Sequence, residues 1–552
     1  MRNFFNNIFG YIETEDYDFI LPNTPNNLIE EKEKLNSNIS VYPDLYDNLN
    51  YLKIKYNLLI NSDINLREFS LPIKTKQYNA CIIYIDGMIN SDSINDFVLQ
   101  PLLLKNSITM QENPGLNSII NPAKKLNLED FIYSGLIPQN SISKETNFDT
   151  VISKINSGSC ALIVDTISSI FCIESKGFKM RSVAAPLVET VIKGPQEAFI
   201  ENIRVNTSLI RKIINNENLI IESFPVGNIS KTQIAVCYMK NIANNTLVAE
   251  TKHRVNNLDI DYLLSSGQLE QLIQDNPTTS FPQVISSERP DKVCSNLLNG
   301  RVAIFINGSP FSIIVPAVFT DFLISSEDAN LNYHYSNFLK SVRGLALFFS
   351  LLLPGIYIAI TAFHQEILPS ELLFTIISAR EAIPFPIIVE IIIMEFCFEL
   401  ILEAGLRSSS ALGNTIGIIG GLVLGEAAVS ANLISPMLII IIALTGLCGF
   451  AIPDFSLKSS IRIFRVMYIL LGFIAGFLGL AFGFFIHFAI LSNLSSFGVP
   501  FFVPYIPFSN LDDNTGFHIN SVWKREKRNK FLNTKRPFAQ NHTSMKWRKN
   551  GQ

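Results

Sequence analysis

The sequence predicts an N-terminal α/β soluble region of two subdomains, followed by an all-α polytopic membrane domain. After residue 344, long apolar stretches dominate, and each is long enough to be considered as a membrane helix. Before that point, short strand-like runs alternate with amphipathic helical patterns, which is typical of mixed α/β domains. Only 17% of the residues are charged, against roughly 25% in an average soluble domain.

Charge, cysteine content and missing motifs exclude several classes of protein. A net charge of −4 argues against a general nucleic-acid binder. The 7 cysteines are odd in number and contain no CxxC pair, so neither a disulfide framework nor a zinc site is expected. The sequence has no Walker loop, no GxGxxG after a strand, no HExxH and no GxSxG. We therefore expect a protein that is not an enzyme and that has no cofactor or metal.

Changes in composition divide the chain into five parts. Asn-rich and acidic residues at the N-terminus predict a mobile arm with one short helix near 43–59, and no signal peptide. The Gly-Pro pair that follows Lys193 separates the two subdomains. The expected parts are 1–70 (polar mobile arm), 71–193 (α/β subdomain 1), 194–335 (α/β subdomain 2), 336–508 (membrane helical domain) and 509–552 (basic C-terminal tail).

Each subdomain has its own predicted elements. In the first, we expect a strand at 81–85, a helix at 93–104 and a hairpin formed by 161–164 and 169–173. In the second, we expect a helix at 197–214, strands at 219–224 and 233–239, and a helix that begins at 257–259. Asn307-Gly308 predicts a type I′ hairpin turn, which favours paired strands at 302–306 and 311–315 over a membrane helix.

The membrane domain contains apolar stretches at 344–363, 383–402, 412–433, 436–452 and 466–491. Pro354 is expected to kink the first of them. Full crossing by all five would place the Lys- and Arg-rich tail outside, against the positive-inside rule. We therefore expect a cytoplasmic tail, with the glutamate-bearing or the glycine-rich stretch not spanning in the ordinary way.

Two periodic rows of residues in the membrane domain are candidate functional features. Glycines at every fourth position suit close helix packing in lipid, and they are Gly413, Gly417, Gly421 and Gly425. Glu395, Glu399 and Glu403 lie on one side of a helix, because positions four apart stay within about 40° of each other. These three carboxylates could line a pore, lie on a solvated interfacial face paired to nearby arginines, or form inert structural pairs.

Several longer motifs in order resemble those of the GerA family of spore germination proteins, in particular the A subunit of nutrient germinant receptors. They are YIDGMINSDSINDFVLQPLL (84–103), KGPQEAFIENIRVNTSLIRK (193–212), SERPDKVCSNLLNGRVAIFINGSPF (287–311), LLLPGIYIAITAFHQEILPSELL (351–373), AREAIPFPIIVEIIIMEFCFELILEAGLR (379–407), AAVSANLISP (427–436) and SSFGVPFFVPYIPF (495–508). The family-motif residues singled out are His364, Gln365, Glu366, Arg380, Glu381, Pro384, Pro386 and Arg407.

The resemblance implies a multi-pass protein of the spore inner membrane, with its N-terminal region on the cytoplasmic (core) side. It implies partnership with a transporter-like B subunit and a lipoprotein C subunit, and contact with membrane lipid. It further implies assembly into a homo-oligomer, a pentamer, that forms a nutrient-gated cation channel. A transporter subunit and a non-conducting membrane scaffold are the alternatives. The chain shows no inverted repeats of the transporter type, and the glutamate row favours a conduit over a scaffold.

Overall fold

The computed structural model describes residues 19–22, 39–73, 76–104, 128–133, 137–138, 141–177, 185–407, 425–506 and 520–540. These residues divide into two compact units. The sheet unit comprises 19–274, 284–316 and the chain from 525 onward, whereas the helical unit comprises 275–283 and 317–524. Two antiparallel sheets with helices lie in the first unit and long apolar helices in the second, which confirms the predicted fold class.

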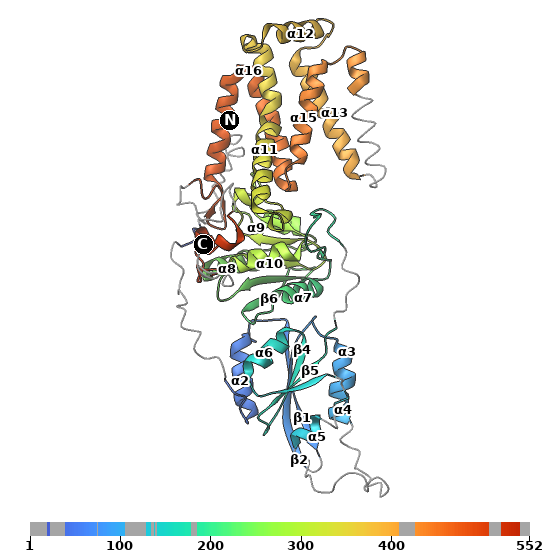
Figure 1. The fold of residues 1–552 in the computed structure, drawn as a ribbon, viewed down its shortest axis with the longest axis vertical. Coiled ribbons are helices and arrows are strands. Elements are labelled where there is room, and N and C mark those ends of the chain that lie inside the picture. The colour runs from blue at the N-terminus through green and yellow to red at the C-terminus, as the bar shows by residue number, and fades with distance from the viewer. Residues whose placement is uncertain are drawn as a thin grey trace. The chain divides into compact units, whose positions relative to one another are not determined.

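The first sheet has five antiparallel strands in the order β1-β2-β4-β5-β3 (Figure 1). Side chains alternate between its two faces, as they must in a strand. Helices α2 and α6 cover one face, and the α3–α4 segment covers the other. The elements are α2 Leu45–Tyr56, β1 Ile64–Ile73, β2 Lys76–Ile85, α3 Ser91–Ile94, the π-helix Asn95–Leu99, α4 Gln100–Leu104, α5 Leu128–Phe131, β3 Ile142–Glu145, α6 Phe148–Asn156, β4 Ser159–Val164 and β5 Ile170–Glu174.

The first subdomain begins earlier than its polarity suggests. The short helix expected near 43–59 is present as α2, but it packs into the core, where Leu52 and Tyr56 are fully buried. Strand β1 then forms the edge of the sheet, within a region we expected to belong to the polar arm as far as residue 70. As an edge strand, β1 exposes many of its side chains, so its sequence lacks the apolar run that marks β4.

The second sheet repeats the strand order of the first, as β6-β7-β9-β10-β8. The predicted hairpin is confirmed, since β9 and β10 pair antiparallel. The turn differs from type I′, because Gly308 has a positive φ whereas Asn307 does not. The elements are α7 Ile203–Ile213, β6 Leu219–Val226, β7 Thr232–Met239, α8 Asn245–Asn256, α9 Ser266–Ile273, β8 Ile285–Ser287, α10 Pro290–Leu298, β9 Val302–Ile306 and β10 Ser312–Val315.

The prediction of a helix that begins at 257–259 is wrong. The chain forms α8 before that point and α9 after it, and the residues between them are not helical. Asn244 caps α8 by accepting a hydrogen bond from the Thr246 amide, and Ser265 caps α9 through the Gln268 amide. The predicted helix at 197–214 likewise begins only at Ile203, after its cap Asn202.

A buried ion pair joins the two subdomains. Arg211 of α7 donates to both carboxylate oxygens of Asp63, at 2.8 and 2.9 Å, and to the side-chain oxygen of Asn61 at 3.2 Å. Beside it, the Ser62 amide donates to Ile221 O on the β6 edge, and the Ile221 amide donates to Asn61 Oδ1, both at 2.9 Å. The loop before β1 therefore extends the hydrogen bonding of the second sheet.

The five cysteines of the sheet unit are all buried. Burial raises the pKa of the Cys81 thiol, and likewise that of Cys172, to about 12. Such thiols remain protonated at neutral pH and pack as small apolar groups.

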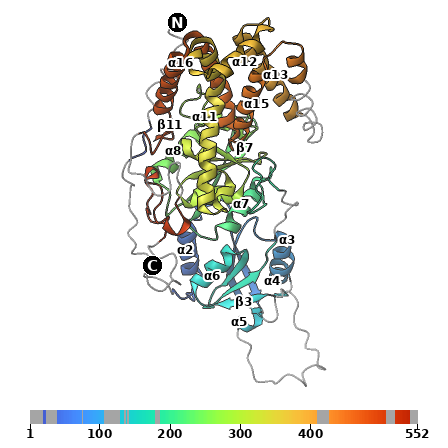
Figure 2. The same cartoon turned by 45° about the horizontal axis from the view of Figure 1, so that its top comes forward.

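The helical unit contains two helices that are long and apolar enough to cross a membrane, α11 and α16, within the ranges that the structure describes. Figure 2 shows α11 beside α16, and α13 beside α15. Helix α11 continues through Pro354. The elements are α11 Tyr333–Phe363, α12 Ser370–Glu381, α13 Ile387–Arg407, α15 Pro436–Phe450 and α16 Phe455–Asn493, with 3-10 turns at Phe319–Leu323, Ser326–Ala329 and Gln365–Ile367 and the short strands β11 Ser495–Ser496 and β12 Val499–Pro500.

Helix α16 reverses direction at Ala475–Gly476, where the backbone leaves the helical region and Gly476 has a φ of +54°. The rings of Phe464 and His487 lie 4.9 Å apart between centroids. A straight helix would separate these positions by roughly 34 Å, at its rise of about 1.5 Å per residue. The fifth apolar stretch, 466–491, is therefore a pair of helices running alongside each other, and not the single span expected from its length.

Helices α13 and α15 run in the same direction. The amide of Ser435, which caps α15, donates to Glu390 near the start of α13 at 3.2 Å. Further along both helices, Gly446 lies against Phe398. The start of α15 therefore lies at the same end of the bundle as the start of α13.

Glycines allow α11 and α16 to touch at their backbones. A Cβ placed on Gly472 would lie 2.8 Å from Gly355 O, and one on Gly355 would lie 2.8 Å from Tyr468 O. Such distances exclude any side chain at either position unless the helices separate. Gly472 lies in the last apolar stretch, and Gly355 directly follows Pro354 in the first.

Candidate functional site: the acidic row of helix α13 and its arginine partners

Helix α13 begins directly after Pro386, whose carbonyl accepts the amides of Val389 and Glu390. The two prolines at 384 and 386 separate it from α12, because proline lacks an amide proton and restricts the preceding residue. The glutamates of α13 differ in their surroundings.

The Glu395 carboxylate belongs to a buried cluster that links three helices. It accepts a hydrogen bond from Arg465 Nη1 of α16 at 3.0 Å. The same guanidinium donates to the backbone oxygen of Ser350 on α11 at 2.8 Å, and to its hydroxyl at 3.0 Å. The side chains of Glu395 and Arg465 are only 16% and 4% exposed. We call Ser350, Glu395 and Arg465 the three-helix cluster.

The next two carboxylates lie at the surface of the single chain. Glu399 pairs with Arg462 of α16 at 2.5 Å, and Glu403 pairs with Arg407 of its own helix at 2.7 Å. Their side chains are 52% and 55% exposed. The row therefore changes from buried to exposed along the helix.

Glu390 lies away from this row, as its helical phase predicts. Its side chain is 1% exposed, and it lies 3.5 Å from the Arg380 guanidinium of α12. It also accepts the Ser435 amide, as described above. Arg380 and Glu390 thus connect α12, α13 and the start of α15.

The family-motif residues at 364–366 lie where α11 ends. The His364 amide donates to Ala359 O and Ile360 O, and its ring lies 5.0 Å from that of Phe477 between centroids. Gln365 donates to Thr361 O at 2.7 Å, whereas Glu366 is exposed. Gly476 lies against the His364 ring, so the reversal of α16 meets this end of α11. Glu381, Pro384 and Pro386 are exposed around the α12–α13 connection.

The glycine row is only partly within the described structure. Gly413, Gly417 and Gly421 lie outside the described residues. Gly425 is described, and a Cβ there would meet Ile439 at 3.8 Å, which is ordinary contact. The packing role of this row stays a prediction.

The partners of Glu395 and Glu399 were not among the residues predicted from the sequence. Arg462 and Arg465 directly precede the last apolar stretch, and Ser350 lies within the first. Because the two arginines are three residues apart, they lie on one side of a helix, which could have suggested a shared partner. No local sequence pattern indicates which helix supplies the carboxylates that pair with these arginines, because that depends on the tertiary packing of the helices.

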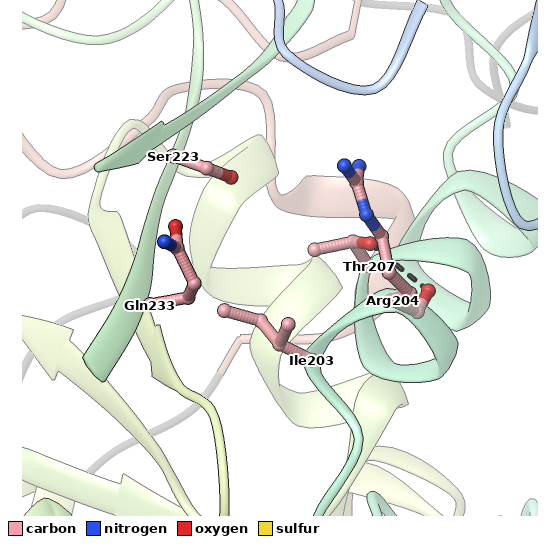
Figure 3. Close-up of a pocket in the computed structure, with 5 residues that line it drawn as sticks. All are labelled: Ile203, Arg204, Thr207, Ser223 and Gln233. Carbon is pink, nitrogen blue, oxygen red and sulfur yellow. Dashed lines mark hydrogen bonds between the residues drawn. The ribbon is translucent and has the colours of Figure 1, made fainter. Parts of the chain in front are cut away.

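The sheet unit contains a small cavity between α7 and the β6–β7 strands (Figure 3). Its volume is about 120 Å³, and its lining residues are Ile203, Arg204, Thr207, Ser223 and Gln233. Ligand pockets usually occupy about 300–1,000 Å³. The Arg204 guanidinium lies 3.6 Å from Asp86, so its charge is already compensated. We assign no ligand to this cavity.

The fold and this site define a membrane protein with a duplicated α/β soluble unit and ion pairs between its apolar helices. The family model described as "Bacillus/Clostridium GerA spore germination protein" matches residues 50–531. The chain therefore belongs to the GerA family of spore germination proteins. Within that family it is of the germinant-receptor A-subunit type, which confirms the resemblance, and it is a receptor subunit rather than an enzyme.

Individual relatives agree with this assignment. "Spore germination protein KA" of Bacillus subtilis (strain 168) is 34% identical over 499 residues, covering 90% of this chain and 88% of the relative. "Spore germination protein GerLA" of Bacillus cereus is 32% identical over 447 residues, covering 81% and 87%. A crystal structure of the N-terminal domain of the A subunit of the Bacillus megaterium spore germinant receptor GerK3 is 34% identical. It covers 51% of this chain and 98% of that chain, with a TM-score of 0.37.

Proposed function

We propose that this A subunit forms an oligomeric, nutrient-gated cation channel in the spore inner membrane. The observation that carries the proposal is the outward exposure of Glu399 and Glu403, at 52% and 55%, on a helix with an otherwise apolar surface. A carboxylate in hydrocarbon costs roughly 2.5–3.5 kcal/mol on insertion scales. These two side chains are therefore expected to face water or a neighbouring subunit.

In a symmetric oligomer each exposed glutamate becomes a ring, and acidic rings attract cations. A homopentamer, working with a transporter-like B subunit and a lipoprotein C subunit, is the assembly we propose. Glu395 and Glu390 have a different role, because both are held inside the single chain by arginines. We assign them to the internal architecture of the subunit.

Removing single charges tests the pore. Glu399→Gln and Glu403→Gln are expected to lower monovalent cation flux, or cation selectivity, while the complex still assembles. The measurement is nutrient-triggered flux from purified complex in liposomes, with and without nutrient. Glu371→Gln is the matched control, because it removes an exposed carboxylate from α12 and leaves the row intact. Unchanged conductance and selectivity in both α13 variants would remove the pore-lining role.

A non-conducting scaffold is the second candidate, and the arginine partners of the acidic row favour it. If every glutamate of the row served only to hold helices, charge removal would reduce assembly and flux together. Flux that falls while assembly is normal supports the channel. Assembly that falls in proportion to flux supports the scaffold.

The connectivity of the chain supports a proposal for the side of the membrane on which each segment lies. The sheet unit contains both the sheet-forming residues that precede α11, up to 316, and the described tail after 525, so we propose that both lie on the cytoplasmic (core) side. If all five apolar stretches cross the membrane and the reversed α16 counts as two crossings, the total is even, and no stretch needs to be exempted from spanning. This removes the conflict between a basic tail and an odd number of spans.

Cysteine labelling tests this topology. In a background without native cysteines, Leu59→Cys and Phe538→Cys are expected to react only from the cytoplasmic side, since both positions are exposed. Glu366→Cys, between α11 and α12, is expected to react only from the opposite side. Labelling of Phe538→Cys together with Glu366→Cys from one side would contradict the proposed topology.

A further inference from the structure

The two halves of the sheet unit are copies of one fold. Each begins with a helix, α2 or α7, and continues through two strands, a helical segment, a strand, a helix and two strands. Both sheets have the same spatial strand order, and every neighbouring pair is antiparallel. We call residues 45–177 repeat 1 and residues 203–315 repeat 2.

The sequences of the repeats correspond at a constant spacing over the α6–β4 and α10–β9 segments. Gly300 follows Gly158 by 142 positions (300 − 158), and identical residues recur at this spacing. The identical pairs are Asp149 and Asp291, Val151 and Val293, Ser153 and Ser295, Gly158 and Gly300, and Ala161 and Ala303. The backbone corresponds too, since Gly158 and Gly300 have φ of +94° and +98°.

Repeat 1 contains a closing segment that repeat 2 lacks at the same place in the chain. Directly after β5, residues 175–177 run back along the end of β2. Ser175 O accepts the Asn90 amide at 2.8 Å, and the Gly177 amide donates to Met88 O at 3.4 Å. Lys176 lies against Gly158, 3.3 Å from a Cβ placed there. In repeat 2 the chain after β10 continues instead toward α11.

The described C-terminal tail occupies the equivalent place in repeat 2. Asn533 O accepts a hydrogen bond from the Asn244 side chain at 3.1 Å. The Lys535 amide donates to Ile242 O at 3.0 Å. Thr534 lies against Gly300, with its Cγ2 2.4 Å from a Cβ placed there.

The three contacts correspond one to one between the repeats. Asn90 and Asn244 are both helix caps, and each stands five residues after the end of the second strand of its repeat. Met88 and Ile242 stand two residues before these caps, and each offers its carbonyl to the closing segment. Residues 175, 176 and 177 thus correspond in order to 533, 534 and 535.

From this correspondence we infer that residues 533–535 are the closing segment of repeat 2. The membrane helices are inserted between β10 and this segment, so repeat 2 is completed only by chain that emerges after the last helix. The surface around Ile242, Asn244 and Gly300 is a docking surface, and its occupant is the C-terminal segment of the same chain.

Further contacts hold the tail on this docking surface. Arg528 donates from Nε to Leu298 O, the last residue of α10, at 2.7 Å. A guanidinium at this end of a helix is favourable, because the final carbonyls carry partial negative charge. Lys535 Nζ donates to Lys240 O at 2.7 Å, and Asn533 donates to Pro22 O at 2.6 Å. Leu532, in the 3-10 turn Lys530–Leu532, is fully buried.

The insertion has consequences for assembly and for coupling. Both ends of the helical unit are covalently joined to repeat 2, so a displacement of either end acts on the same small sheet. Repeat 2 can close only when the last helix has returned the chain to the side of the membrane where the sheet lies. Residues 533–535 can therefore dock on repeat 2 only after the helical unit has been inserted in full.

A pair of glycines provides the test. Gly300 and Gly308 both have a positive φ, of +98° and +92°, but a Cβ on Gly308 would meet nothing within 4 Å. Gly300→Ala and Gly308→Ala therefore introduce similar backbone strain, and only the first displaces Thr534. The measurement is hydrogen exchange of the Lys535 amide in the full-length, detergent-solubilised chain. We expect exchange to rise by roughly tenfold or more in Gly300→Ala, and less in Gly308→Ala.

A second substitution separates displacement from unfolding. Thr534→Ala removes the Cγ2 atom and leaves a Cβ that would lie 3.6 Å from the new one, an ordinary contact. The double variant Gly300→Ala/Thr534→Ala is therefore expected to recover the protection of Gly308→Ala. Equal exchange in the two glycine variants, or a double variant no better than Gly300→Ala, would overturn the inference. Neither readout depends on ion conduction.

Discussion

Replacing Arg211 with alanine is expected to destabilise the sheet unit by about 3–5 kcal/mol. The substitution leaves the Asp63 carboxylate buried without its cation, and removing one partner of a buried ion pair costs about this much. It also removes a hydrogen bond to Asn61, which holds the edge of β6. Thermal unfolding of the full-length, detergent-solubilised chain measures the change, and exchange of the Ile221 amide locates it.

Lys212→Ala is the matched control, because Lys212 is the next residue and pairs with the exposed Glu197. An exposed pair of this kind contributes about 0–1 kcal/mol. The double variant Arg211→Met/Asp63→Leu is expected to recover much of the loss, since it leaves no buried charge. Equal effects for Arg211→Ala and Lys212→Ala would contradict the role of the ion pair as the joint between the repeats.

Replacing Arg465 with methionine is expected to destabilise the helical unit by a similar amount, about 3–5 kcal/mol. The Glu395 carboxylate would lose its cation, and Ser350 would lose both of its contacts to the guanidinium. Three helices are connected through this one side chain, so the packing of α11, α13 and α16 is expected to loosen together. The measurement is the fraction of folded, monodisperse protein after solubilisation, followed as a function of temperature.

Arg462→Met provides the comparison, because its partner Glu399 is half exposed and can be solvated. The double variant Arg465→Met/Glu395→Gln is expected to be more stable than Arg465→Met alone, since the charge is removed with its partner. If Arg462→Met were as damaging as Arg465→Met, burial of the three-helix cluster would not be the cause.

Local patterns were sufficient for most of the second repeat and for much of the first. Strands β4 and β9 are continuous apolar runs, and the Asn307-Gly308 pair marked the hairpin that follows β9. The edge strand β1 was missed because many of its described side chains face solvent, so that its composition resembles that of a linker. Helix α8 was missed because its signal lies in the cap Asn244 rather than in an apolar face.

In the candidate site, helical phase alone separated Glu390 from the Glu395, Glu399 and Glu403 row. The sequence by itself also determined the family, the two soluble subdomains and the presence of a membrane domain, because long motifs and apolar runs are local. Only the tertiary structure decided that Glu395 is buried, because its partner Arg465 lies on α16, 70 residues away in the chain. The reversal of α16 and the return of residues 533–535 to repeat 2 were likewise tertiary facts. Both depend on contacts between segments that no local pattern connects.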